Sequence, residues 1–238
     1  GLRVTSEDVM SVARPLMYRE NLRLVEALED RGIRARGIQH GVFQCSFLDR
    51  QNLGLVGEVE SVELDAVESA VRSGAVPVLT CLGESPSGQV LNINADIATR
   101  ELVWKLRPHK VIFLSPTGGL LDRQDRIISA VSLSNDYEAL MQQPWLHSGM
   151  RLKLQQINEM LMNLPDDTSV SITSAAHLTR ELFTYRGAGT LVRKGEGINV
   201  FENPDAETLA IVKNLVEKSF QKTLNDSWFE NLDEPLVL

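Results

Sequence analysis

The segment that most clearly suggests chemistry is the stretch from Gly83 to Asp96, where an apolar run leads through a polar loop into an expected helix. Asn92, Asn94 and Asp96 place amide and carboxylate groups at alternate positions around that junction. A helix N-terminus attracts anions, asparagine amides donate to carboxylates, and an aspartate can orient a nearby lysine or metal ion. The alternative interpretation is that Asn94 or Asp96 only caps the helix.

Two further segments have the residue types of an anion site. Lys153 lies in the first turn of an expected helix, where a cation opposes the helix dipole, so it either serves an anionic ligand or is a solvated lysine. Ser115, Thr117 and Gly118 follow an apolar strand, and the turn they form either admits a phosphate to the backbone or is a plain tight turn. Its spacing matches neither a P-loop nor a dinucleotide fingerprint.

A fourth segment runs from Glu181 to Thr190 and contains Gly187 and Gly189 at a helix-to-strand junction. We expect both glycines to supply positive φ angles there, which is a structural role. The histidines show no ligand spacing, and we expect no metal site; they are His40, His109, His147 and His177.

The elements that position these residues alternate between strands and helices, which predicts an α/β fold with a mainly parallel sheet and ligands at the carboxyl ends of its strands. Helices are expected over 6–30, 65–73, 94–106, 134–142, 150–164, 175–183 and 206–220. Pro15 should kink or split the first of them. Strands are expected over 110–114, 169–173 and 190–193, short strands or a hairpin within 37–59, and a strand buried on both faces over 76–82.

Composition excludes several classes of protein. The 238 residues are 43% hydrophobic and 24% charged, which is typical of a globular chain. A net charge of −8, with 5% aromatic residues and no basic cluster, disfavours nucleic-acid binding. No apolar run approaches the roughly 20 residues of a membrane span. The two cysteines fit a reducing compartment, and the opening Gly1-Leu2-Arg3, without Met or a signal core, reads like part of a longer intracellular protein.

Together these segments resemble the N-acetylglutamate kinase branch of the amino acid kinase family over essentially residues 1–197. The matching stretches are Gly1–Thr5, Leu91–Asp96, Gly149–Lys153 and Gly187–Thr190. Residues 111–122, 145–154 and 181–194 look more particularly like bifunctional N-acetylglutamate synthase/kinase proteins. The resemblance implies an amino acid kinase domain over 1–198, with a three-layer αβα sandwich. Residues 199–238 would then be a linker and the start of a GNAT-like acetyltransferase domain.

The implied reaction is phosphoryl transfer from ATP to the side-chain carboxylate of N-acetyl-L-glutamate, in arginine biosynthesis. By resemblance, Arg3, Asn92 and Asn94 bind this substrate. Asp96 orients catalytic lysines, and Lys153 neutralises charge on the transferring group. The nucleotide is bound at the turn that contains Ser115, Thr117 and Gly118. Mg²⁺ is held through the phosphates, and acetyl-CoA is used only if the downstream transferase domain is present.

The resemblance also implies regulation by arginine at a site containing His177, Glu181, Gly187 and Gly189. Glu181 would pair with the guanidinium, or it pairs locally on its own helix. We expect a homo-oligomer in the cytoplasm or, alternatively, the mitochondrial matrix. Other interpretations are an N-acetylglutamate synthase in which this domain is regulatory, and a non-enzymatic arginine sensor.

The sequence departs from the family pattern in two places. The family's N-terminal strand with a catalytic lysine and its glycine-rich loops do not lie within the 238 residues, so this chain by itself is expected to lack half of the phosphate site. Pro116 stands where single-function kinases commonly have an aspartate.

Overall fold

A computed structural model of the chain describes residues 4–146, 148–184, 187–195, 200–201, 205–223 and 236–237. The α-helices are α1 Glu7–Glu29, α2 Asp65–Arg72, α3 Ala95–Leu106, α4 Leu133–Met141, α5 Ser148–Met162, α6 Leu178–Phe183 and α7 Ala206–Phe220. The strands are β1 Ala35–Ile38, β2 Phe43–Phe47, β3 Gly57–Val62, β4 Val76–Leu79, β5 Leu82–Glu84, β6 Val90–Asn92, β7 Lys110–Leu114, β8 Ala130–Ser132, β9 Ser169–Thr173, β10 Thr190–Arg193, β11 Val200–Phe201 and β12 Leu236–Val237. A 3₁₀ turn, Ala175–His177, precedes α6.

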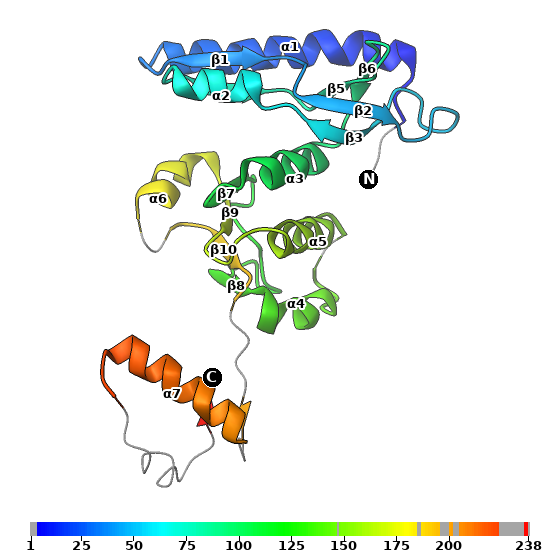
Figure 1. The fold of residues 1–238 in the computed structure, drawn as a ribbon. Helices are drawn as coiled ribbons and strands as arrows, with labels where there is room; N and C mark the ends of the chain where they lie inside the picture. Colours follow the sequence, from blue (N-terminus) through cyan, green and yellow to red (C-terminus); the bar gives the residue numbers. More distant parts are fainter. Residues whose placement is uncertain are drawn as a thin grey trace.

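The strands form two four-stranded sheets, in the orders β3-β2-β5-β6 and β7-β9-β10-β8, and two further pairs, β1-β4 and β11-β12. Parallel pairing joins β1 to β4, β2 to β5, β7 to β9 and β8 to β10. Figure 1 shows α1 lying along β1, and α5 and α6 on opposite sides of the sheet β7-β9-β10-β8. The expected α/β fold class is confirmed.

Each sheet has its own buried core. One cluster gathers around β2, β5 and β6 and includes Phe43, Leu82 and Leu91, while the other gathers around β9 and α5 and includes Ile157 and Ile172. All five residues of β9 are buried, as expected for a central strand with helices on both faces. The helix α3 borders both clusters, since Ala98 belongs to the first and Val103 to the second.

The first helix follows its sequence signals except at Pro15. The side chain of Ser6 accepts a hydrogen bond from the Val9 N–H at 3.2 Å and caps the helix. Pro15 does not split α1, which runs unbroken from Glu7 to Glu29. The helix packs on β1 and β4, where the Asn21 side chain donates to the Val78 carbonyl at 2.8 Å. Packing of this kind outweighs the single backbone bond that a proline removes.

The prediction of one buried strand over 76–82 is wrong. The chain forms two strands here, because β4 pairs with β1, whereas β5 pairs with β2 and β6. The hydrogen-bonding partner changes at Thr80 and Cys81, where the Thr80 hydroxyl donates to the Gln39 carbonyl. Nor is β4 buried on both faces, since Val76 is 45% exposed. The polar loop expected after Gly83 is the turn of a hairpin formed by β5 and β6.

Candidate active site

At the junction between β6 and α3, the side chains of Asn94 and Asp96 make different contacts. The Asn94 side-chain oxygen accepts from the backbone N–H groups of Asp96 and Ile97, at 2.9 and 3.3 Å. The capping interpretation therefore describes Asn94 in this structure. With Asn94 as the cap, the Asp96 carboxylate is left to contact another element.

That element is α5, where Lys153 lies opposite Asp96. The distance from Lys153 Nζ to Asp96 Oδ1 is 3.1 Å, and the two side chains are 24% and 33% exposed. The same ammonium lies 4.5 Å from the centre of the Phe113 ring on β7. A partly exposed ion pair of this kind stabilises a fold by about 1 kcal/mol at most. Its geometry matters more, because it fixes a positive charge at the start of α3.

A set of contacts that sequence reasoning missed continues this alignment along α3 and α5. One turn after Asp96, the Arg100 guanidinium lies 2.9 Å from the Glu159 carboxylate of α5. One turn further, the Trp104 indole N–H donates to the Met160 carbonyl at 3.1 Å. The signal was the four-residue spacing of Asp96, Arg100 and Trp104, which places them on one helix face. These contacts hold the two helices in the register that puts Lys153 beside Asp96.

A cavity of about 330 Å³ lies between α1 and the junction of β6 with α3. Its lining residues are Val4, Thr5, Val9, Ala13, Met17, Val56, Asn92, Ile93, Asn94 and Ala95. Asn92 is held at the polar side, where its amide donates to the Thr5 hydroxyl at 3.1 Å. Aliphatic walls with a few fixed polar groups suit a small molecule that is partly apolar and partly polar. Arg3 lies outside the described residues, although Val4, which follows it, is at the wall.

The turn after β7 brings Ser115, Thr117 and Gly118 together. The hydroxyls of Ser115 and Thr117 are 2.9 Å apart, and Gly118 has a φ of +72°. A Cβ on Gly119 would lie 2.8 Å from the Ile127 side chain, so only glycine fits there without a shift. Gly118 and Gly119 are buried, so the groups of this turn that a phosphate could reach are the hydroxyls of Ser115, which is partly exposed, and Thr117, which is exposed.

The turn rests on the strand that follows Gly189. The Thr190 hydroxyl, fully buried, accepts from the Leu120 N–H at 2.7 Å. A Cβ on Gly189 would collide with the Ile172 carbonyl and lie 3.0 Å from that of Gly118. Close approach therefore explains Gly189, and the expected positive φ there is wrong. Sequence reasoning did not assign Thr190 this role, because its contact with residue 120 spans 70 residues of chain.

Glu181 is buried, with 4% exposure, and its partners lie outside its own helix. Its carboxylate is 2.9 Å from Lys110 Nζ on β7 and accepts the Ala188 N–H at 3.0 Å. Burial raises the pKa of Glu181, but hydrogen bonds from Lys110 and Ala188, with the charge of Lys110, outweigh it and hold that pKa below its usual value. Gly187, with a φ of +60°, leaves the room this carboxylate needs. The alternative of local pairing is therefore wrong.

His177 and Gly189 complete the group expected to bind arginine. His177 Nδ1 lies 3.3 Å from the hydroxyl of Ser174, three residues earlier. The structure thus brings Glu181 next to Gly187, while it gives His177 a partner within its own turn. Their role toward arginine stays a prediction.

Two broader features concern the described residues only. Among them, no group of three or more His, Cys, Asp or Glu side chains is placed to hold a metal ion. None of the described helices is long and apolar enough to cross a membrane. His147 lies outside the described residues.

The chain is similar in sequence to acetylglutamate kinases and to an N-acetylglutamate synthase. Acetylglutamate kinase of Xanthomonas campestris pv. campestris is 48% identical over 231 residues, which cover 97% of this chain and 54% of the relative. Human mitochondrial N-acetylglutamate synthase is 32% identical over 176 residues, covering 74% of this chain and 33% of the relative. This chain thus spans about half of the bacterial kinase and a third of the human synthase.

A solved structure bears on the fold alone. N-acetylglutamate synthase from Neisseria gonorrhoeae, in complex with coenzyme A and N-acetyl-glutamate, matches with a TM-score of 0.79 at 18% identity. The match covers 100% of this chain and 57% of that one. The sequence model of the amino acid kinase family matches residues 2–174, which include the cavity, the Asp96–Lys153 pair and the turn after β7. The chain therefore belongs to the amino acid kinase family.

Proposed function

We propose that this chain is the kinase part of an acetylglutamate kinase, which transfers a phosphoryl group from ATP to the side-chain carboxylate of N-acetyl-L-glutamate in arginine biosynthesis. The observation that carries the proposal is the Asp96–Lys153 pair at the start of α3, next to the cavity that Asn92 lines. The 48% identity to the Xanthomonas kinase over nearly the whole chain supports it.

In this proposal the aliphatic wall of the cavity packs the carbon chain of N-acetyl-L-glutamate, and Asn92 binds its polar end. A carboxylate oxygen attacks the γ-phosphorus, the bond to the ADP oxygen breaks, and the products are an acyl phosphate and ADP. No proton is removed, because the carboxylate is already ionised. Asp96 therefore acts as the group that holds the Lys153 ammonium, and Lys153 stabilises the charge on the transferring phosphoryl group.

The turn after β7 fits the phosphates of ATP. The hydroxyls of Ser115 and Thr117 lie together on its accessible side, where the positive φ of Gly118 turns the chain tightly behind them. Mg²⁺ would supply charge neutralisation between the phosphates. We propose that the phosphates carry it, as the described residues offer no ready cluster of protein ligands.

The experiment is ADP release by the full-length protein with ATP, Mg²⁺ and N-acetyl-L-glutamate. We expect substrate-dependent release that falls by at least 100-fold in Lys153→Ala, since electrostatic groups of this kind contribute about 10²–10³ to kcat. Asp96→Asn should lower kcat more than it raises KM. Lys105→Ala removes an exposed lysine of the same helix as Asp96 and should leave release unchanged. No release from the folded wild-type protein would overturn the proposal.

A second candidate is an N-acetylglutamate synthase in which this domain regulates and assembles the enzyme. The 32% identity to the human synthase favours it. In that case, the protein would consume acetyl-CoA with glutamate but release no ADP, and the Asp96 and Lys153 variants would not affect the rate.

We also propose that residues 1–198 form the kinase domain and that 199–238 are a linker and the start of a GNAT-like acetyltransferase domain, which would bring acetyl-CoA as a cosubstrate. The resemblance of residues 209–232 to such a domain supports this boundary. We further propose a homo-oligomer, located in the cytoplasm or the mitochondrial matrix, that binds arginine as an effector near Glu181. The proximity of its carboxylate to Gly187 supports the last point.

A further inference from the structure

A second cavity, of about 400 Å³, opens at the other end of α1, where none of the residues assigned to the proposed kinase reaction lie. It forms because two helix-to-strand turns lie side by side. Gly32, with a φ of +76°, turns the chain from α1 into β1, and Gly74, with a φ of +73°, turns it from α2 into β4. Since β1 and β4 are parallel neighbours, both turns open at the same edge.

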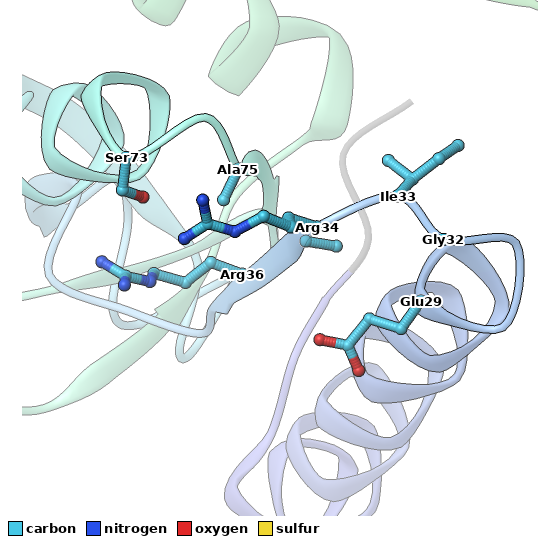
Figure 2. Close-up of a pocket in the computed structure, with 8 residues that line it drawn as sticks. Glu29, Gly32, Ile33, Arg34, Arg36, Ser73 and Ala75 are labelled. Atoms are coloured by element: carbon cyan, nitrogen blue, oxygen red, sulfur yellow. The ribbon is translucent and has the colours of Figure 1, made fainter.

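Three charged side chains line this cavity, namely Glu29, Arg34 and Arg36. Arg36 lies on β1 and Arg34 immediately precedes the strand, so the two share one face, about 6.6 Å apart along the chain. Figure 2 shows both guanidinium groups running toward Ser73, with the Glu29 carboxylate on the side of α1.

Within the described part of the chain, none of these three side chains forms a hydrogen bond or an ion pair. Neighbouring arginines behave differently, because Arg31 donates to the Ala27 carbonyl at 2.9 Å and Arg72 pairs with Glu68 at 2.9 Å. Opposite charges that face one cavity without meeting leave space for a molecule that satisfies both.

The arrangement of charge selects the class of that molecule. Two guanidinium groups bind carboxylates through their planar forks of donors. The opposite side combines the Glu29 carboxylate with the C-terminal end of α1, whose partial negative charge favours a cation. A simple anion would satisfy only the first side and would be repelled by the second.

We propose that this cavity binds a dicarboxylic α-amino acid, with its carboxylates at Arg34 and Arg36 and its ammonium at Glu29. All three side chains are exposed, so salt screens the contacts, and we expect a dissociation constant in the millimolar range. The proposal does not depend on the kinase reaction, because the site shares no residue with it.

The test is a ligand-observed NMR titration of the full-length protein with L-glutamate, and with glutarate as the same molecule without its ammonium. The variants are Arg34→Ala/Arg36→Ala, Glu29→Gln and, as a matched loss of two positive charges on α1, Arg19→Ala/Arg23→Ala, whose side chains are 66% and 67% exposed. Circular dichroism and thermal unfolding confirm that each variant is folded, as expected for exposed positions.

We expect Arg34→Ala/Arg36→Ala to raise the dissociation constant for one bound glutamate at least tenfold, while Arg19→Ala/Arg23→Ala leaves it unchanged. Glu29→Gln should weaken glutamate several-fold and leave glutarate equal or tighter, because only glutamate carries the ammonium. Unchanged glutamate binding in Arg34→Ala/Arg36→Ala would overturn the proposal. Equal responses of glutamate and glutarate to Glu29→Gln would overturn the amino-acid assignment in favour of a simple anion site. ADP release is measured separately, so failure of the kinase proposal is distinguishable.

Discussion

At the scale of single residues, Asn94 and Asp96 illustrate what sequence reasoning can reach. Both residue types cap helices equally well, so the pattern predicted a cap without saying which residue forms it. The choice depends on Lys153, which lies 57 positions away and 3.1 Å from Asp96. Their placement in one site was inferred from the family resemblance, because spacing along the chain carries no information about which helix faces which.

Glu181 gives a pH-dependent prediction at this scale. Its pKa is lowered in the folded protein, so it stabilises the fold above its usual pKa of 4.5, and that stabilisation is lost as the pH falls through the lower folded-state value. Glu181→Gln should therefore lower the free energy of unfolding at pH 7 by about 1–3 kcal/mol. The difference from wild type should close in acid, as urea unfolding at several pH values would measure.

The control is Glu58→Gln, an exposed glutamate on β3 that should change stability by less than about 0.5 kcal/mol at any pH. The same Glu181 variant tests the proposed arginine site. We expect it to weaken the effect of arginine on activity, whether that effect is inhibition or activation. A Glu181→Gln protein with full arginine sensitivity would contradict that role, and a constant stability difference from pH 7 to pH 3 would contradict the pKa argument.

At the scale of elements, helices and strands with local signals were predictable. Strands β7, β9 and β10 have the bounds expected, and α3 begins one residue after its expected start because Asn94 is its cap. The division of 76–82 between two sheets was not predictable, because an apolar run does not reveal where its hydrogen-bonding partner changes. Strand β8, of three residues, was missed for the same reason: its pairing with β10 is long-range.

Two glycine-to-alanine substitutions should have opposite effects on stability, one through packing and the other through helix propensity. A Cβ at Gly189 would collide with the Ile172 carbonyl, so Gly189→Ala must move β9 or β10 and should destabilise the protein by about 1–3 kcal/mol. A methyl group added to Gly149 in α5 would meet open space, with no neighbouring atom within 4 Å, so Gly149→Ala should stabilise by about 0.5–1 kcal/mol. Thermal unfolding of both variants checks the opposite signs, and a stable Gly189→Ala protein would show that the strands can separate freely.

At the scale of the whole molecule, two cores meet at α3, and each depends on its own buried residues. Leu91 and Ile157 are both fully buried, one in each cluster. Leu91→Ala and Ile157→Ala should each cost about 2–5 kcal/mol, whereas Val12→Ala on the exposed face of α1 should cost less than about 0.5 kcal/mol. Denaturant unfolding measures all three, and a small loss in either buried variant would mean that its cluster does not support the fold.

The Asp96–Lys153 pair lies at one end of the contact between α3 and α5, and Arg100 and Trp104 continue that contact. Two rigid rods that touch along a line have a simple mechanical property. A small rotation about the far end of the line becomes a larger sideways displacement at the near end. The position of the ammonium is therefore set by leverage along the helices, and a substitution about 12 Å from Asp96, two turns along α3, can misalign it without touching it.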